Sequence, residues 1–261
     1  MDVHVPLITP FDEDGGIATA ALTRLAHQVL DDGAAGIVAL GTTAEPGSLS
    51  AAERAEVLDL LGAIGRERRV QLTVGTDDPR ELAGYPAVTA ALVRVPPFVR
   101  PGEDGVVAWF EALPKPVPVI AYHVPLRTGQ DLSAAAIRRL AAIDGVIGMK
   151  YAPTTLDADA VDLLTDPPPG FTMLAATDVL LTPMIALGAT GAILASANVA
   201  HETSDRLRSA LFAEPNPTVI KGVLHAQGKI PTPGVRLPLL PASRTSVDAA
   251  LHHLAQAFRP R

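Results

Sequence analysis

The chain has 261 residues, 48% of them hydrophobic, and a formal net charge of −7 at pH 7. A single α/β barrel is commonly this long, and the apolar content suffices for a large core. The sequence has no cysteine, which excludes disulfides and thiol catalysis, and its acidic balance without a basic cluster argues against a nucleic-acid partner. We see neither a signal-peptide layout nor an apolar stretch that could span a bilayer, so we expect a cytoplasmic protein that does not bind membranes.

Short apolar runs of strand length alternate with helical patterns along most of the chain. The eight expected strands are residues 3–9, 36–40, 70–74, 91–95, 117–122, 146–150, 171–175 and 191–195. This alternation favours a parallel sheet with helices outside it. Eight such units in a chain of this length fit a (β/α)8 TIM barrel, and no GxGxxG or Walker A loop supports an open nucleotide-binding sheet.

Helical spacing and capping signals define the segments between the strands. The expected helices are residues 20–30, 50–64, 103–113, 133–142 and 246–258, with two turns at most in 79–88. Ser50, followed three residues later by Glu53, has the pattern of a capping box. We expect residues 1–200 to form the barrel. Residues 201–261 would add its last helix, a proline-rich tail over 215–241 and a C-terminal helical extension within the same structural unit.

Lys150 lies near the end of an apolar segment of strand length. Burying an ammonium is costly, and a lysine with a depressed pKa is a nucleophile that can condense with a carbonyl. The ordinary alternative is a lysine whose stem covers apolar surface while its head lies in water. The other lysines, Lys115, Lys221 and Lys229, lie beside prolines, glycines or polar residues, and we expect them to be solvated.

Three expected strands end in residues that could share one site, because barrel enzymes place their sites at the carboxyl ends of the strands. The second strand runs into Thr42 and Thr43. The fifth ends at Tyr122, with Arg127 beyond it, and the sixth ends at Lys150. Each has an ordinary explanation as a turn, strand or surface residue. Together they supply the amine, the proton shuttle and the carboxylate donors of a Schiff-base aldolase.

Three segments resemble the signature motifs of the dihydrodipicolinate synthase and N-acetylneuraminate lyase family. They are Gly-Thr-Thr-Ala-Glu at 41–45, Tyr-His-Val-Pro-Leu-Arg-Thr-Gly at 122–129 and Gly-Met-Lys at 148–150. Further similarity covers residues 6–11, 188–200 and 214–217. The resemblance therefore spans nearly the whole chain.

The resemblance implies a barrel enzyme without a cofactor or metal ion, in which Lys150 forms an imine with pyruvate or a related 2-keto acid. Thr42 and Thr43 would bind the carboxylate of the keto acid. Tyr122 would be the general acid and base, and the hydroxyl of Thr43 would link it into a proton relay.

The resemblance also gives roles to two residues nearer the second substrate. Ile193 would line the pocket, because it matches a position whose backbone lies near the imine. Arg127 resembles the synthase branch, where an arginine holds the carboxylate of aspartate semialdehyde, a task that suits a guanidinium. We expect a homo-oligomer, a dimer or a tetramer, as in this family.

Four positions depart from the family pattern. They are Phe98, where the synthases carry a relay tyrosine contributed across a subunit interface; Pro97 before it; His123, in place of an asparagine; and Ala176, in place of a glycine. Two stretches, 74–96 and 200–214, are also shorter than in the family. Because a helical hairpin is missing from the second stretch, we expect a reduced C-terminal helical extension.

Three functions fit the sequence to different degrees. The leading hypothesis is a Schiff-base lyase or aldolase nearest to the enzymes that condense pyruvate with aspartate semialdehyde. A close alternative is an aldolase or dehydratase of 2-keto-3-deoxy sugar acids or related 2-keto acids. The third is a non-catalytic relative that binds a keto acid. The scattered histidines do not favour a metal-dependent aldolase.

Overall fold

In the computed structural model, which describes residues 1–257, eight strands close into a barrel in chain order. They are β1 (Asp2–Pro6), β2 (Gly36–Ala39), β3 (Gln71–Gly75), β4 (Ala90–Arg94), β5 (Val119–His123), β6 (Val146–Tyr151), β7 (Thr172–Ala175) and β8 (Gly191–Ile193). Each predicted strand is present, with its ends shifted by a few residues. The predicted (β/α)8 barrel is therefore confirmed.

Helices follow the strands along the chain. The α-helices are α1 (Thr19–Asp31), α2 (Ala51–Arg68), α3 (Gly102–Ala112), α4 (Pro125–Thr128), α5 (Ala134–Ala141), α6 (Ala158–Thr165), α7 (Leu181–Leu187), α8 (Asp205–Leu211), α9 (Thr218–Ala226) and α10 (Arg244–Ala257). Short 3-10 turns are η1 (Thr42–Ala44), η2 (Pro46–Ser48), η3 (Pro79–Leu82), η4 (Asp178–Leu180) and η5 (Ala195–Asn198). None of the helices within residues 1–257 has the length and apolar character needed to cross a bilayer.

Three expectations about the helices need correction or comment. The segment predicted to form two helical turns forms only the 3-10 turn η3. Helix α9 lies inside the stretch that was expected to be a proline-rich tail. The last predicted helix begins two residues earlier than expected, at Arg244, and its predicted last residue, Phe258, lies outside the described residues.

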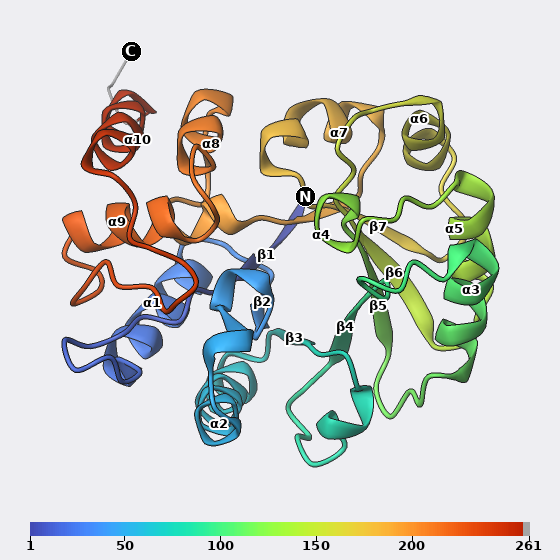
Figure 1. Cartoon of the computed structure of the whole chain (residues 1–261), viewed down its shortest axis with the longest axis horizontal. Coiled ribbons are helices and arrows are strands. Elements are labelled where there is room, and N and C mark those ends of the chain that lie inside the picture. The colour runs from blue at the N-terminus through green and yellow to red at the C-terminus, as the bar shows by residue number, and fades with distance from the viewer. Residues whose placement is uncertain (258–261) are drawn as a thin grey trace. The chain divides into compact units, whose positions relative to one another are not determined.

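Contacts within the chain group its residues into two compact units. Unit 1 comprises Met1–Asp2 and Thr73–Ile193, and unit 2 comprises Val3–Leu72 and the chain from Leu194 onward. In unit 1, the strands from β3 to β8 pair in parallel in sequence order. Helix α3 packs on α5, α5 on α6, and α6 on α7, and Figure 1 shows the first three of these helices following one another beside β5, β6 and β7.

A glycine in β6 fixes how closely β6 and β7 approach. A Cβ atom at Gly148 would lie 2.7 Å from the carbonyl oxygen of Thr172, which no side chain tolerates. The close pairing continues along the strands and sets Lys150 opposite Leu174. The position two residues before Lys150 therefore has to be glycine for packing reasons alone.

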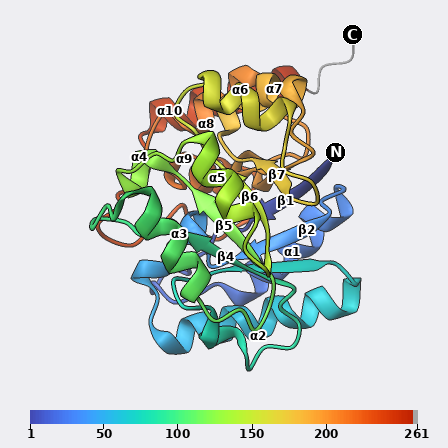
Figure 2. The same cartoon turned by 90° about the vertical axis from the view of Figure 1, so that its right-hand side faces the viewer.

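In unit 2, β1 and β2 pair in parallel, and α1 packs on α2. The predicted capping box of α2 is confirmed, because the Ser50 hydroxyl accepts from the Glu53 backbone N–H and the Glu53 carboxylate accepts from the Ser50 N–H at 2.7 Å. Helix α10 packs on both α8 and α9, and the three helices lie together in both views (Figures 1 and 2).

Candidate active site

Lys150 and Tyr122 lie at paired positions of the neighbouring strands β6 and β5. Side chains at such positions project to the same face of a sheet. The Lys150 Nζ atom lies 4.1 Å from the centre of the Tyr122 ring, and Lys150 is only 6% exposed. Little of the Lys150 side chain therefore reaches the surface, and its amine lies against an aromatic ring, which does not favour the alternative of a strand-end lysine with its head in water.

The residues that follow each of this pair in sequence project to the opposite face. His123 is buried, and its ring stacks on that of Tyr151 with centroids 5.3 Å apart. The His123 Nε2 atom lies 2.9 Å from the Asp131 carboxylate, and this hydrogen bond lowers the pKa of Asp131. Burial raises the pKa of Tyr151. His123 thus joins the end of β5 to the loop before α5 and does not share the face of Lys150.

Arg127 lies on α4, the short helix that begins at Pro125 directly after β5. Its side chain is exposed, and within residues 1–257 it forms no ion pair. Proline suits the first position of a helix, so the turn that places Arg127 just after the strand is encoded locally. An exposed, unpaired guanidinium is available to bind an anion.

The positions that depart from the family pattern have distinct surroundings. Phe98, in the loop after β4, is 91% exposed and has a positive φ of 67°. Its ring brings no hydroxyl to the face of Lys150. Ala176 follows β7, and its backbone N–H donates to the Tyr151 carbonyl oxygen at 3.0 Å. Ile193 ends β8 and is buried.

Thr42 and Thr43 lie in unit 2, in the turn η1 that follows β2. Thr43 is buried, and its Oγ1 atom accepts a hydrogen bond of 2.9 Å from the Asn216 side-chain amide. The turn is also held at Ala44, whose carbonyl oxygen accepts from the Thr9 hydroxyl at 2.8 Å. Glu45 ends the turn in the left-handed region with a φ of 56°, a conformation that a non-glycine residue adopts only when its surroundings hold it.

A buried ion pair holds Glu45. Its Oε1 atom lies 2.6 Å from the Nζ atom of Lys221 on α9, and both side chains are almost wholly buried. The same ammonium donates to the Gly234 carbonyl oxygen at 2.8 Å and lies 4.0 Å from the Phe11 ring centre. The expectation that Lys221 is solvated is therefore wrong. Burial lowers the pKa of Lys221 to about 8, and the carboxylate of Glu45 opposes this shift.

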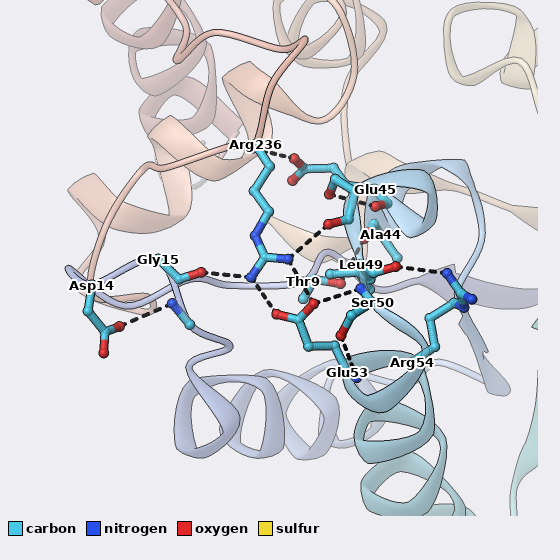
Figure 3. Close-up of polar contacts among 12 residues, drawn as sticks. Thr9, Asp14, Gly15, Ala44, Glu45, Leu49, Ser50, Glu53, Arg54 and Arg236 are labelled. Atoms are coloured by element: carbon cyan, nitrogen blue, oxygen red, sulfur yellow. Dashed lines mark hydrogen bonds and ion pairs between the residues drawn. The ribbon is translucent and has the colours of Figure 1, made fainter.

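Arg236 extends this network to the start of α2, as Figure 3 shows. Its backbone N–H donates to Glu45 Oε2 at 2.9 Å. Its guanidinium forms two hydrogen bonds with Glu53, of 2.5 and 3.0 Å, and two more with the carbonyl oxygens of Gly15 and Ser48. The bonds from Arg236 hold the pKa of Glu53 at about 2. The turns η1 and η2 are thus fixed by the C-terminal part of unit 2.

The expectation of a proline-rich tail over residues 215–241 gave no indication of this network. The signal in the sequence is the run Val-Ile-Lys-Gly-Val-Leu at 219–224, in which apolar residues recur at helical spacing around Lys221. A lysine among apolar neighbours in a helix needs a buried partner as much as one in a strand does. Within residues 1–257, no three side chains of histidine, aspartate or glutamate gather as a metal site.

Comparisons with known proteins identify the family. The model of the dihydrodipicolinate synthetase family matches residues 1–208. The chain belongs to this family. The 4-hydroxy-tetrahydrodipicolinate synthase of Syntrophus aciditrophicus is 31% identical over 277 residues, which cover 93% of each chain. The solved dihydrodipicolinate synthase of Acinetobacter baumannii, in complex with pyruvate, is 28% identical, with a TM-score of 0.87 and 98% of each chain covered.

A further solved structure supports the fold alone. The dihydrodipicolinate synthase of Thermotoga maritima superposes with a TM-score of 0.90 over 98% of each chain, at 23% identity. Membership of the family makes this chain an enzyme, a lyase of the class I aldolase type. The predicted family and enzyme class are confirmed.

Proposed function

We propose that Lys150 forms an imine with pyruvate or a related 2-keto acid. The enzyme then joins the keto acid to an aldehyde or, in the reverse direction, cleaves such a condensation product into the two. The observation that carries this proposal is the position of the amine of the buried residue Lys150, 4.1 Å from the ring centre of Tyr122. The pyruvate complex of the Acinetobacter baumannii relative supports the choice of keto acid. A nucleophilic amine next to a phenol matches the needs of this chemistry.

In the proposed reaction, the neutral Lys150 amine attacks the keto carbon and forms a carbinolamine. Loss of water gives the imine, and loss of a proton from the adjacent methyl group gives an enamine. The enamine carbon attacks the aldehyde, and hydrolysis with one water releases the product and restores the amine. Tyr122 carries the protons to the departing hydroxyl and to the aldehyde oxygen.

We assign the carboxylate of the keto acid to Thr42 and Thr43. Both follow β2 in a turn that is held in place by the bond from Thr9 to Ala44 and by the ion pair at Glu45. A carboxylate can accept hydrogen bonds from threonine hydroxyls and from the N–H groups at the start of such a turn. The Thr43 hydroxyl would also accept from Tyr122 and so complete the relay. Ile193 would line the pocket near the imine.

For the second substrate, we propose aspartate semialdehyde, bound through its carboxylate by Arg127. The exposed and unpaired guanidinium on α4 supports this choice, as do relatives named 4-hydroxy-tetrahydrodipicolinate synthase at about 30% identity. Two observations favour a 2-keto-3-deoxy sugar acid instead. Phe98 brings no hydroxyl to a relay, and Ala176 adds a methyl group where the family pattern has glycine.

A panel of substrates tests the choice. The purified enzyme is given pyruvate with aspartate semialdehyde in one set of reactions and single 2-keto-3-deoxy sugar acids in another. A kcat/KM for pyruvate with aspartate semialdehyde that is at least a hundredfold above that for any sugar acid would support synthase activity. Turnover of the sugar acids alone would replace the second substrate but leave Lys150 as the nucleophile. No turnover of either set, by a folded protein, would favour a keto-acid-binding relative without catalysis.

A further inference from the structure

Two hydrogen-bonded links join the turn η1 to the segment around the start of α9. Asn216, two residues before α9, donates to the Thr43 hydroxyl at 2.9 Å. Lys221, on α9, pairs with Glu45 at 2.6 Å. The linked positions are 173 and 176 residues apart in sequence, so only the folded unit brings them together. We propose that Asn216 is a positioning residue that sets the direction of the Thr43 hydroxyl proton for binding the keto-acid carboxylate.

The argument begins with what a threonine hydroxyl can do. It has one proton to donate and two lone pairs that accept. Asn216 Nδ2 occupies one lone pair of Thr43, which turns the hydroxyl proton away from the amide. Among residues 1–257, that proton has no acceptor. A carboxylate, which only accepts, is the matching ligand for a hydroxyl held in this way.

The backbone around Thr43 does not depend on Asn216. Ala44 is held by Thr9, and Glu45 is held by Lys221 and by the backbone N–H of Arg236. Removing the Asn216 amide should therefore leave the turn in place and free only the hydroxyl. The Asn216 Oδ1 atom is buried and has no partner among residues 1–257. In this part of the chain, the bond to Thr43 is the one side-chain hydrogen bond that Asn216 forms.

This inference rests on the proposed imine, so its test reads the imine directly. Borohydride reduction is measured as a function of pyruvate concentration for the wild type, Asn216→Ala and Asn216→Asp. We expect Asn216→Ala to raise the half-saturating pyruvate concentration about tenfold, the usual size of one hydrogen bond, with the same plateau. Asn216→Asp should raise it about a hundredfold, because the new carboxylate accepts the Thr43 proton and repels the substrate.

Two controls separate positioning from a loss of structure. Acetone has the carbonyl of pyruvate with a methyl group in place of the carboxylate, so its trapping should be unchanged in both variants. Ser243→Ala removes the exposed 2.7 Å hydrogen bond from Ser243 to Glu214, which lies two residues before Asn216. This variant should leave pyruvate trapping unchanged. Equal weakening with pyruvate and acetone would overturn the inference.

A double variant tests whether Asn216 acts through Thr43. In a Thr43→Val background, Asn216→Ala should have no further effect, because the hydroxyl that it orients is gone. An unchanged half-saturating concentration in both single variants, or a full additive loss in the double variant, would contradict the assignment while the imine on Lys150 stands. If the wild type traps no pyruvate, the proposed function fails, and the inference fails with it.

Discussion

The Lys150 amine lies over the ring of Tyr122, 4.1 Å from its centre, because the two residues face each other across β6 and β5. The strand register thus brings the proposed nucleophile and the proposed proton carrier together without any loop. Both side chains are buried, which shields the pair from bulk water. Such a rigid placement is typical of barrel active sites.

If Tyr122 carries protons, Tyr122→Phe should lower kcat by about 10²- to 10⁴-fold, the usual contribution of a general acid or base. The matched control is Tyr151→Phe, because Tyr151 lies on β6 beside Lys150 but stacks on His123 at the opposite face. It should retain normal kinetics. Near-normal turnover by Tyr122→Phe would show that the proton takes another route.

If Arg127 binds the carboxylate of the second substrate, Arg127→Ala should raise the KM for aspartate semialdehyde about a hundredfold. The KM for pyruvate should change little. Arg139→Ala removes an exposed arginine on α5 that pairs with Asp104, and steady-state kinetics should not distinguish it from the wild type. Equal increases in both KM values for Arg127→Ala would count against this role.

Removing one partner of the Glu45 and Lys221 pair should be strongly destabilising. Lys221→Met leaves a buried carboxylate without its ion partner, and we expect a loss of about 3–5 kcal/mol in the free energy of unfolding. Adding Glu45→Leu should restore much of this loss. The control is Lys229, a half-buried lysine shortly after α9. Lys229→Met should lower the free energy of unfolding by about 1 kcal/mol or less. Denaturant unfolding measures all four proteins, and similar losses in the two lysine variants would contradict the account.

The Glu53 carboxylate should stabilise the fold in a pH-dependent way. Its pKa of about 2 in the folded chain lies below the ordinary value of 4.5, chiefly because of the bonds from Arg236. The stabilisation is therefore complete above about pH 5 and is lost as the pH falls toward 2. The difference in Tm between the wild type and Glu53→Gln should shrink over this window. Glu56→Gln, an exposed change on the same helix, should show no such trend.

The sequence predicts the fold well because local signals and the global fold agree in this chain. Strand-length apolar runs gave the barrel order, and Ser50 with Glu53 gave the capped start of α2. The sequence did not predict the surroundings of single charged residues. Lys221 looks solvated by its neighbours in sequence, but its partner Glu45 is 176 residues away. Similarly, nothing in the motif around Thr43 indicates that Asn216 bonds to it.

Borohydride reduction of the enzyme with pyruvate tests the central claim most directly. Intact-mass spectrometry should show one reduced pyruvate per chain, and peptide mapping should place it on Lys150. The Lys150→Ala variant should remain folded, take up no adduct and lose turnover. An adduct on Lys115, Lys221 or Lys229, or turnover that survives Lys150→Ala, would contradict the imine mechanism.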